Sequence, residues 1–62
     1  MSKQDISQIN FIARRYGVNR IALGHYIHTV KAEAGFRGDL VFGRNGEMIA
    51  GDEIIGNIDD LM

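Results

Sequence analysis

Apolar residues recur at intervals of three and four positions near the start of the chain, which predicts a helix over residues 2–16. The apolar stripe consists of Ile6, Ile9, Ala13 and Tyr16, and it is broadened by Phe11 and Ile12. Ser2 and Asp5 stand at the spacing of a capping side chain and a first-turn carboxylate, so the helix is expected to begin there. Gly17 suits the left-handed residue that ends a helix, and Val18 suits the apolar residue that folds back on it.

A second apolar stripe with the same spacing predicts a helix over residues 20–34. Asn19 is a favourable N-cap, and Gly35 followed by Phe36 indicates where the helix ends. The stripe consists of Leu23, Tyr26, Ile27, Val30 and Ala34, of which the first four are expected at the centre of the core. Because only a few residues separate the two helices, they are expected to lie side by side as a helical hairpin over residues 2–34.

The pattern then changes to a strand-like alternation over residues 40–50. Asn45-Gly46 is a dipeptide favoured in two-residue type I′ turns, in which both positions have positive φ. Such a turn pairs Arg44 with Glu47, Gly43 with Met48 and Phe42 with Ile49. Because opposite charges and apolar side chains are favourable partners across two strands, these pairs predict a β-hairpin.

The closing stretch predicts a short third strand at residues 53–55, because Gly56-Asn57 interrupts the run of isoleucines. A turn and one terminal turn of helix are expected to follow. The predicted fold is therefore α+β: a two-helix hairpin packed on a small antiparallel β-hairpin with a short third strand. We expect a single small domain over residues 1–62, made of a helical hairpin at 2–34, a β-ribbon at 40–55 and a tail at 56–62.

The composition is that of an ordinary globular domain, with 45% hydrophobic and 24% charged residues. The chain has no Cys, which excludes disulfides and thiolate metal sites within it. Its 62 residues are too few for the large cofactor-binding folds, and no apolar run is long enough to span a membrane. Because residues 1–8 contain no apolar signal-peptide core, we expect a soluble chain that acts in the cytoplasm and has no membrane partner.

Charge is segregated along the chain behind a net charge of −1. Residues 1–37 carry six basic and two acidic side chains, whereas residues 38–62 carry one basic and six acidic side chains. A basic half can contact phosphate groups, so the first half is the candidate surface for RNA or DNA. The alternative is that the two halves neutralise each other within one fold, or across two copies of the chain in a homodimer.

The predicted second helix carries the residues best suited to chemistry. Gly24, His28 and Lys31 recur at i, i+4 and i+7, and His25 lies beside them on the helix. Glycine inside a helix costs about 1 kcal/mol relative to alanine, so Gly24 either opens space for a ligand beside His28 or lets the first helix pack closely. His28 can accept a proton near neutral pH, and Lys31 can contact an anion. His25 and His28 lack a third ligand nearby, so neither a metal site nor a cofactor is expected.

The stretch IARRYGVNRIALGHYI, residues 12–27, resembles a helix-turn-helix DNA-binding unit. Ala13 matches the small residue at the helix crossing, Gly17 the turn, and Leu23 the residue that points into the core. The resemblance implies that the hairpin is a wing. It also implies that the second helix presents to the DNA groove Asn19, Arg20, Ile21, Gly24 and His25.

A broader resemblance covers most of residues 13–60. The segments RRYGVNRIALGHYIHTVKAEAG and GDEIIGNIDD look like the C-terminal tips of bacterial polymorphic toxins of the Rhs and filamentous-haemagglutinin type. The motif G-x-x-I-H-x-x-K is met by Gly24, Ile27, His28 and Lys31, and the motif I-G-N-x-x-D by Ile55, Gly56, Asn57 and Asp60. Such tips are commonly nucleases, many of them inferred ribonucleases, and each is blocked by a cognate immunity protein.

A ribonuclease of this kind needs no metal, because a neutral histidine can take the 2′-hydroxyl proton while cations hold the phosphate. The resemblance implies His28 as that base, with His25 as the other candidate. The expected nucleic-acid contacts are Arg14, Arg15, Arg20 and Lys31. The leading hypothesis is therefore a small nucleic-acid-facing toxin-tip domain with metal-independent ribonuclease activity. The alternatives are a helix-turn-helix DNA-binding module and a protein-interaction or dimerisation module with no enzymatic activity.

Overall fold

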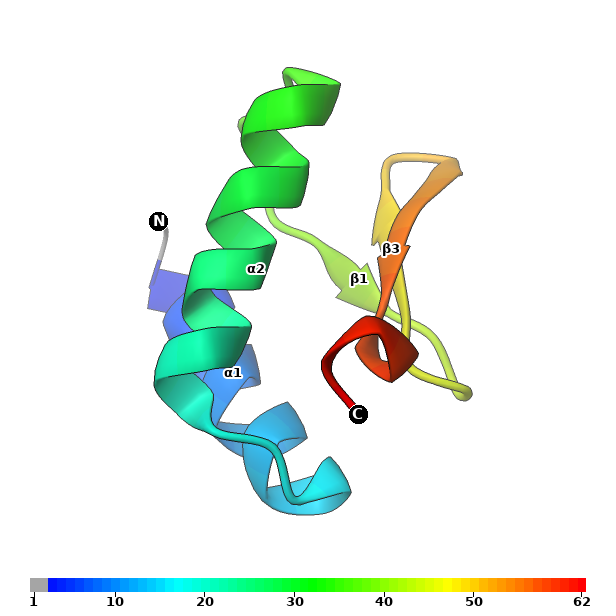
Figure 1. Cartoon of the computed structure of the whole chain (residues 1–62). Coiled ribbons are helices and arrows are strands. Elements are labelled where there is room, and N and C mark those ends of the chain that lie inside the picture. The colour runs from blue at the N-terminus through cyan, green and yellow to red at the C-terminus, as the bar shows by residue number, and fades with distance from the viewer. Residues whose placement is uncertain (1–2) are drawn as a thin grey trace.

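The computed structural model describes the backbone of residues 3–62 and the side chains of residues 6–62. Its elements are α1 (Lys3–Tyr16), α2 (Arg20–Ala34), β1 (Val41–Phe42), β2 (Glu47–Ala50), β3 (Glu53–Asn57) and the 3₁₀ turn η1 (Ile58–Leu61). The helices pack against one face of an antiparallel sheet with strand order β1-β2-β3 (Figure 1). The predicted α+β fold is confirmed, whereas the predicted capping by Ser2 and Asp5 lies outside the described residues and side chains.

Local capping interactions determine where both helices end. Gly17 has φ of 70°, and the Val18 N–H donates to the Ala13 carbonyl at 3.1 Å, as in a Schellman cap. Gly35 ends α2 in the same way, with φ of 67°, and the following N–H, that of Phe36, donates to a helix carbonyl at 3.0 Å. The boundaries predicted at these two glycines are therefore confirmed.

The hairpin between β1 and β2 is confirmed, but its predicted register is wrong. The observed pairs are Val41 with Ile49 and Phe42 with Met48. In this register Met48 is completely buried on the helix side of the sheet, whereas Ile49 is only half-buried. Because a slip of one residue would exchange the two faces of a strand, burial of Met48 selects the observed pairing.

The turn of this hairpin also differs from the predicted type I′ geometry. Its loop spans residues 44–46, and within it only Gly46 has positive φ, at 83°. The Gly43 N–H donates to the Glu47 carbonyl at 2.8 Å, and the Gly46 N–H donates to the Gly43 carbonyl at 3.1 Å. This is the pattern of a type I turn followed by a left-handed glycine bulge. A hydrogen bond of 2.7 Å from the Asn45 N–H to the Glu47 carboxylate further stabilises it.

The last strand is longer than predicted, and residues 56–62 are not a peripheral tail. β3 continues two residues beyond the predicted end and leads directly into η1. Tyr26 covers Gly56 so closely that a Cβ at this position would lie 2.9 Å from the tyrosine Oη. Ile58, the first residue of η1, is completely buried. The C-terminal segment therefore completes the core.

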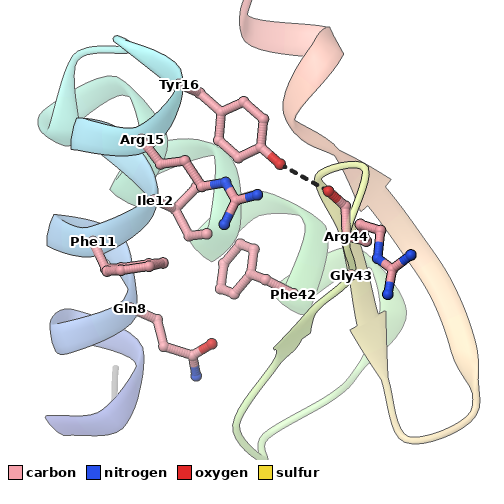
Figure 2. A pocket seen from close by; sticks show the side chains of 8 residues that line it. All are labelled: Gln8, Phe11, Ile12, Arg15, Tyr16, Phe42, Gly43 and Arg44. Carbon is pink, nitrogen blue, oxygen red and sulfur yellow. Dashed lines mark hydrogen bonds between the residues drawn. The ribbon is translucent and has the colours of Figure 1, made fainter.

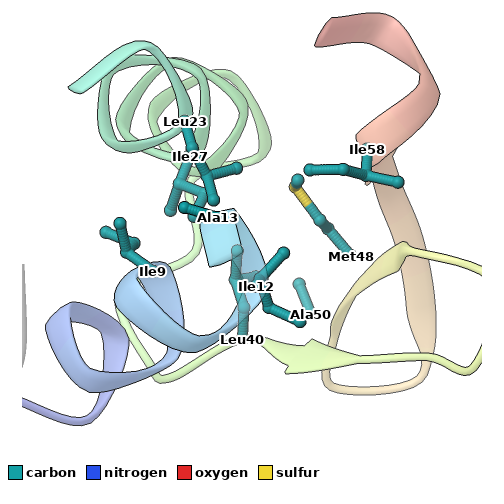
Figure 3. Packing of buried hydrophobic residues seen from close by; sticks show 9 residues of the cluster. All are labelled: Ile9, Ile12, Ala13, Leu23, Ile27, Leu40, Met48, Ala50 and Ile58. Atoms are coloured by element: carbon teal, nitrogen blue, oxygen red, sulfur yellow. The ribbon is translucent and has the colours of Figure 1, made fainter. Parts of the chain in front are cut away.

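The core lies between the helix layer and the sheet (Figure 3). Its buried members are Ile9, Ile12, Ala13, Leu23, Ile27, Leu40, Met48, Ala50 and Ile58. Leu23 and Ile27 lie at its centre as predicted, whereas Tyr26 and Val30 are half-buried. The prediction was wrong for three apolar residues, Ile6, Phe11 and Ala34, which are exposed.

A row of β-branched residues crosses the other face of the sheet. Val41 lies opposite Ile49, and Ile49 lies opposite Ile54 on β3. Val41 and Ile54 are 58% and 61% exposed. The outer face therefore presents an apolar row that the described part of the chain leaves uncovered, and we call it the outer row.

Tyr26 links α2 to the C-terminal segment. Its hydroxyl donates to the Asp60 carboxylate and accepts a hydrogen bond from the Asn57 N–H at 3.3 Å. Burial, followed by the hydrogen bond to Asp60, raises the pKa of Tyr26 above its usual value of 10.0, because both favour the neutral phenol. The neutral Tyr26 phenol therefore contributes its full stabilisation of the fold below about pH 10, and this contribution is lost as the pH rises through the raised pKa.

Replacing Tyr26 by Phe keeps the ring and removes both hydrogen bonds. We expect Tyr26→Phe to lower the free energy of unfolding by about 0.5–1.5 kcal/mol at neutral pH. We also expect the variant to lose less stability than the wild type above about pH 10, since it has no phenol to ionise there. Urea denaturation at neutral pH and over an alkaline series measures both effects. If the wild type and the variant lose the same stability at alkaline pH, ionisation of Tyr26 is not the cause of that loss.

Candidate functional site

The connection between the helices brings together arginines from both. The cap at Gly17 and the N-cap at Asn19 reverse the chain between the end of α1 and the start of α2. The Asn19 Oδ1 accepts hydrogen bonds from the N–H groups of residues 21 and 22 at 2.8 and 3.1 Å, which fixes the first turn of α2. As a result Arg14 and Arg20 line the same hollow, of about 520 Å³, together with Asn10, Ala13 and Val18.

A neighbouring hollow contains both histidines. It has a volume of about 400 Å³ and is lined by Arg20, Ile21, Gly24, His25 and His28. Helical spacing brings these residues to one side of α2, because residues three or four apart lie on the same face of a helix. Both imidazoles and the guanidinium of Arg20 are exposed, so a solvent-borne ligand can reach all three groups. We call this the histidine hollow.

The environment of Gly24 bears on the choice between close packing and open space. A Cβ built at this position would lie 3.8 Å from the Ile9 Cδ1 of α1, which is an ordinary van der Waals contact. Packing of α1 against α2 therefore does not require glycine here. Gly24 also lines the histidine hollow together with His28.

Lys31 lies beyond the residues that line the histidine hollow. Its Nζ is 5.9 Å from the centroid of the Phe36 ring, within the range of a cation–π contact. Lys31 is therefore placed at the C-terminal end of α2, near the helix cap, while Arg20 is placed at the N-terminal end. The helix separates these two predicted phosphate contacts along its length.

Arg15 lines two further hollows beside α1. The first, of about 700 Å³, is lined by Asn10, Phe11, Arg14 and Arg15. The second, of about 380 Å³, lies between α1 and the β1–β2 hairpin, and Figure 2 shows the side chains around it. It is lined by Gln8, Phe11, Ile12, Arg15, Tyr16, Phe42, Gly43 and Arg44. We call this the hairpin hollow.

Two hydrogen bonds hold the hairpin beside α1. The Tyr16 hydroxyl donates to the Arg44 carbonyl at 3.3 Å (Figure 2), and the Gln8 Nε2 donates to the Leu40 carbonyl at 3.0 Å. The Arg15 guanidinium lies 5.8 Å from the centroid of the Tyr16 ring. The backbone of Arg44 is therefore fixed next to the arginines of α1, although the two segments are far apart in the sequence.

The four hollows are linked because neighbouring ones share lining residues. Arg20 belongs to the first two, Arg14 and Asn10 connect them to the third, and Phe11 and Arg15 connect the third to the hairpin hollow. Among residues 6–62, no acidic side chain lines any of the four. We call this surface the basic track, and its cationic or proton-accepting members are His28, His25, Arg20, Arg14 and Arg15. Arg44 lines the hairpin hollow, but its guanidinium points away from α1 (Figure 2).

Two residues around this surface have other roles in the sequence-based prediction. The pattern predicts Phe11 in the apolar stripe of the first helix and Arg44 opposite Glu47 in the hairpin. The spacing of Phe11 from Arg14 and Arg15, three and four residues, could have indicated a shared helix face. No local signal could have placed Arg44, because its position depends on how the hairpin packs against α1.

Metal ligands, membrane-spanning helices and similar proteins add no functional group to the basic track in the part of the chain that the structure describes. No three His, Asp or Glu side chains gather to form a metal site within residues 6–62. Neither helix of residues 3–62 is long and apolar enough to cross a membrane. Comparisons with protein-family models, curated proteins and solved structures find no match to the chain.

Proposed function

We propose that this chain is a small RNA-binding domain that cleaves RNA without a metal, with the reaction in the histidine hollow. The observation that carries the proposal is that two imidazoles and one guanidinium line a single hollow of about 400 Å³. Cleavage of RNA by its own 2′-hydroxyl requires a base, an acid and a cation for the phosphate. The histidine hollow supplies each of these three groups.

Each group has a defined part in the proposed reaction. The neutral imidazole of His28 accepts the proton of a ribose 2′-hydroxyl, and the 2′-oxygen forms a bond to the adjacent phosphorus. The bond from phosphorus to the 5′-oxygen breaks, and protonated His25 donates a proton to that oxygen. Arg20 stabilises the negative charge on the phosphoryl oxygens during the transfer. The products are a 2′,3′-cyclic phosphate and a free 5′-hydroxyl.

The resemblance to toxin tips supports RNA as the substrate. Within the motif G-x-x-I-H-x-x-K, Gly24 and His28 line the histidine hollow, whereas Ile27 belongs to the core and Lys31 lies near the helix cap. Arg14 adds a second guanidinium next to Arg20, where the neighbouring phosphate of a bound strand would lie.

His28→Gln is expected to reduce RNA cleavage by about 100-fold or more, since glutamine keeps a hydrogen bond but cannot transfer a proton. His28 is exposed, so the melting temperature should remain that of the wild type. The measurement is cleavage of a labelled RNA in the presence of a chelator, followed on a denaturing gel. Lys31→Gln is the matched control on the same helix outside the histidine hollow, and it should retain turnover.

Three results would change the proposal, two from this assay and one from a measurement of DNA binding. If the wild-type protein cleaves no RNA at any pH tested, the proposed enzymatic function is overturned. Equal cleavage by wild type and His28→Gln would assign the base to His25 instead. Tight binding of duplex DNA without RNA cleavage would favour the helix-turn-helix alternative.

Gly24→Ala tests whether the glycine at this position opens a ligand site or lets α1 pack closely against α2. The added methyl group would meet Ile9 only at an ordinary contact distance, so we expect stability to rise by up to about 1 kcal/mol from helix propensity. Because Gly24 lines the histidine hollow, we expect the methyl group to narrow it, so cleavage should fall although the fold is more stable. Thermal denaturation and the cleavage assay measure the two effects. Reduced stability would show that α1 needs the glycine.

A second candidate function is protein binding through the outer row. Val41 and Ile54 are well exposed and lie on either side of Ile49 in one cross-strand row. An immunity protein or a second copy of the chain would bury such a row. Sedimentation equilibrium of the wild type and of Ile54→Lys tests the second copy, because the charge should abolish an association through this face. Self-association that the substitution removes, together with no RNA cleavage, would favour this function.

A further inference from the structure

The hairpin hollow has features that cleavage in the histidine hollow does not use. Phe11 is an aromatic residue that α1 leaves 64% exposed, and Arg14 and Arg15 follow it at three and four residues. Isolated exposed apolar residues are common and need no explanation. Phe11 is different, because it lines two adjoining hollows in which arginines are its neighbours.

The geometry of the hollow suits a flat group that carries a negative charge beside it. Figure 2 shows the rings of Phe11, from α1, and Phe42, from β1, on two sides of the same space, with the guanidinium of Arg15 nearby. The volume of about 380 Å³ falls within the range of small-ligand sites. It is suited to a single nucleobase and is too small for the two strands of a duplex.

Charge indicates which kind of flat group would bind. Arg15 lines the hollow, Arg14 and Arg15 line the adjoining one, and no acidic side chain of residues 6–62 lines either. An uncharged aromatic ligand could stack on these side chains but would leave both arginines without an anionic partner. A nucleotide within a strand has both a face that stacks on an aromatic ring and a phosphate that an arginine can neutralise.

Shared lining residues connect the hairpin hollow to the reaction site. The hairpin hollow adjoins the Arg14–Arg15 hollow, which leads through the Arg14–Arg20 hollow to His25 and His28. Only a strand with unstacked bases can place one base in the hairpin hollow and a phosphate beside the histidines.

We propose that the hairpin hollow is a base-binding subsite for single-stranded RNA. One base stacks on Phe11, its phosphates contact Arg15 and Arg14, and the strand follows the basic track to the histidine hollow. The choice of RNA over other single strands rests on the proposed function. The subsite itself lies away from the reacting phosphate, so it controls binding and not the chemical step.

The test uses a fluorescent 2′-O-methyl RNA of about 12 nucleotides, which presents single-stranded bases but cannot be cleaved. Phe11→Leu should weaken its binding, measured by fluorescence anisotropy, by roughly tenfold through loss of one stacked base. Phe11→Tyr should restore wild-type affinity because it keeps an aromatic ring. Ile6→Ala is the matched control, since it shortens an exposed apolar residue of the same helix outside the basic track, and it should leave the affinity for RNA unchanged.

Two further measurements make the assignment specific. Arg15→Gln should reduce the slope of log affinity against log salt by about 0.7, the value for one phosphate contact on a single strand. Phe11→Leu should raise the KM for RNA cleavage and leave kcat unchanged, because the subsite is remote from the reacting phosphate. A duplex of the same sequence should bind more weakly and should be insensitive to Phe11→Leu.

The outcomes separate this inference from the proposed function. Cleavage of RNA with no effect of Phe11→Leu on affinity or KM would overturn the subsite and leave the reaction in place. Binding that depends on Phe11 without any cleavage would support the subsite and overturn the ribonuclease. Equal Phe11 dependence for duplex and single strand would overturn the single-strand assignment. No binding of the labelled strand would overturn both proposals.

Discussion

Gly46→Ala is expected to unfold the protein at temperatures at which Gly51→Ala remains folded. Gly46 has φ of 83°, a conformation that costs an L-residue about 1–2 kcal/mol relative to glycine. A Cβ at this position would also lie 2.1 Å from the Cγ2 of Ile58, so either the hairpin turn or η1 has to move. Ile58 is completely buried, and its N–H donates to the Gly46 carbonyl at 2.9 Å. The substitution therefore disturbs both the hydrogen bond and the core.

Gly51 provides the matched control for this prediction. It has φ of 67°, and a Cβ there would have no neighbouring atom within 4 Å. Gly51→Ala should therefore cost only the conformational strain, about 1–2 kcal/mol, which corresponds to a fall in Tm of roughly 5–15 °C. A domain of this length has a total stability of about 3–9 kcal/mol, so the additional clash at Gly46 is expected to consume most of it. Thermal unfolding followed by circular dichroism measures both variants, and similar Tm values would contradict the packing of Ile58 on Gly46.

Ile27→Ala should lower the free energy of unfolding by about 2–5 kcal/mol, because it empties the centre of the core. Ile27 is 1% exposed and lies among the buried residues of both helices and the sheet (Figure 3). The lost methyl groups leave a cavity that the surrounding helices and strands can fill only in part. In so small a domain this loss is expected to leave a substantial unfolded population at room temperature.

Ile21→Ala makes the identical substitution on the same helix at a residue that is 65% exposed. It should change the free energy of unfolding by less than about 0.5 kcal/mol. Urea denaturation of the two variants gives the difference directly. A cooperative Ile27→Ala protein with near wild-type stability would show that α2 buries another face.

The sequence determined the helices, because their boundaries depend on residues that are close together in the chain. The caps at Gly17, Asn19 and Gly35 each act through side chains or φ angles within one helical turn. The positions of His25 and His28 beside Arg20 also follow from helical spacing alone. The α+β class and the central part of the core, Leu23 and Ile27 among them, were predictable for the same reason.

The tertiary structure decided everything that depends on contacts between distant segments. The register of the hairpin follows from burial of Met48 against the helices, and the extended β3 follows from Tyr26 covering Gly56. Phe11 is exposed because it lies beside the buried face of α1, at the open space between this helix and the hairpin, a fact that the apolar pattern of one helix cannot reveal. The hairpin hollow likewise exists only because the hairpin packs beside α1, where the Tyr16 hydroxyl donates to the Arg44 carbonyl. Local rules act through neighbouring residues, whereas each of these features depends on the burial of a side chain by an element far away in the sequence.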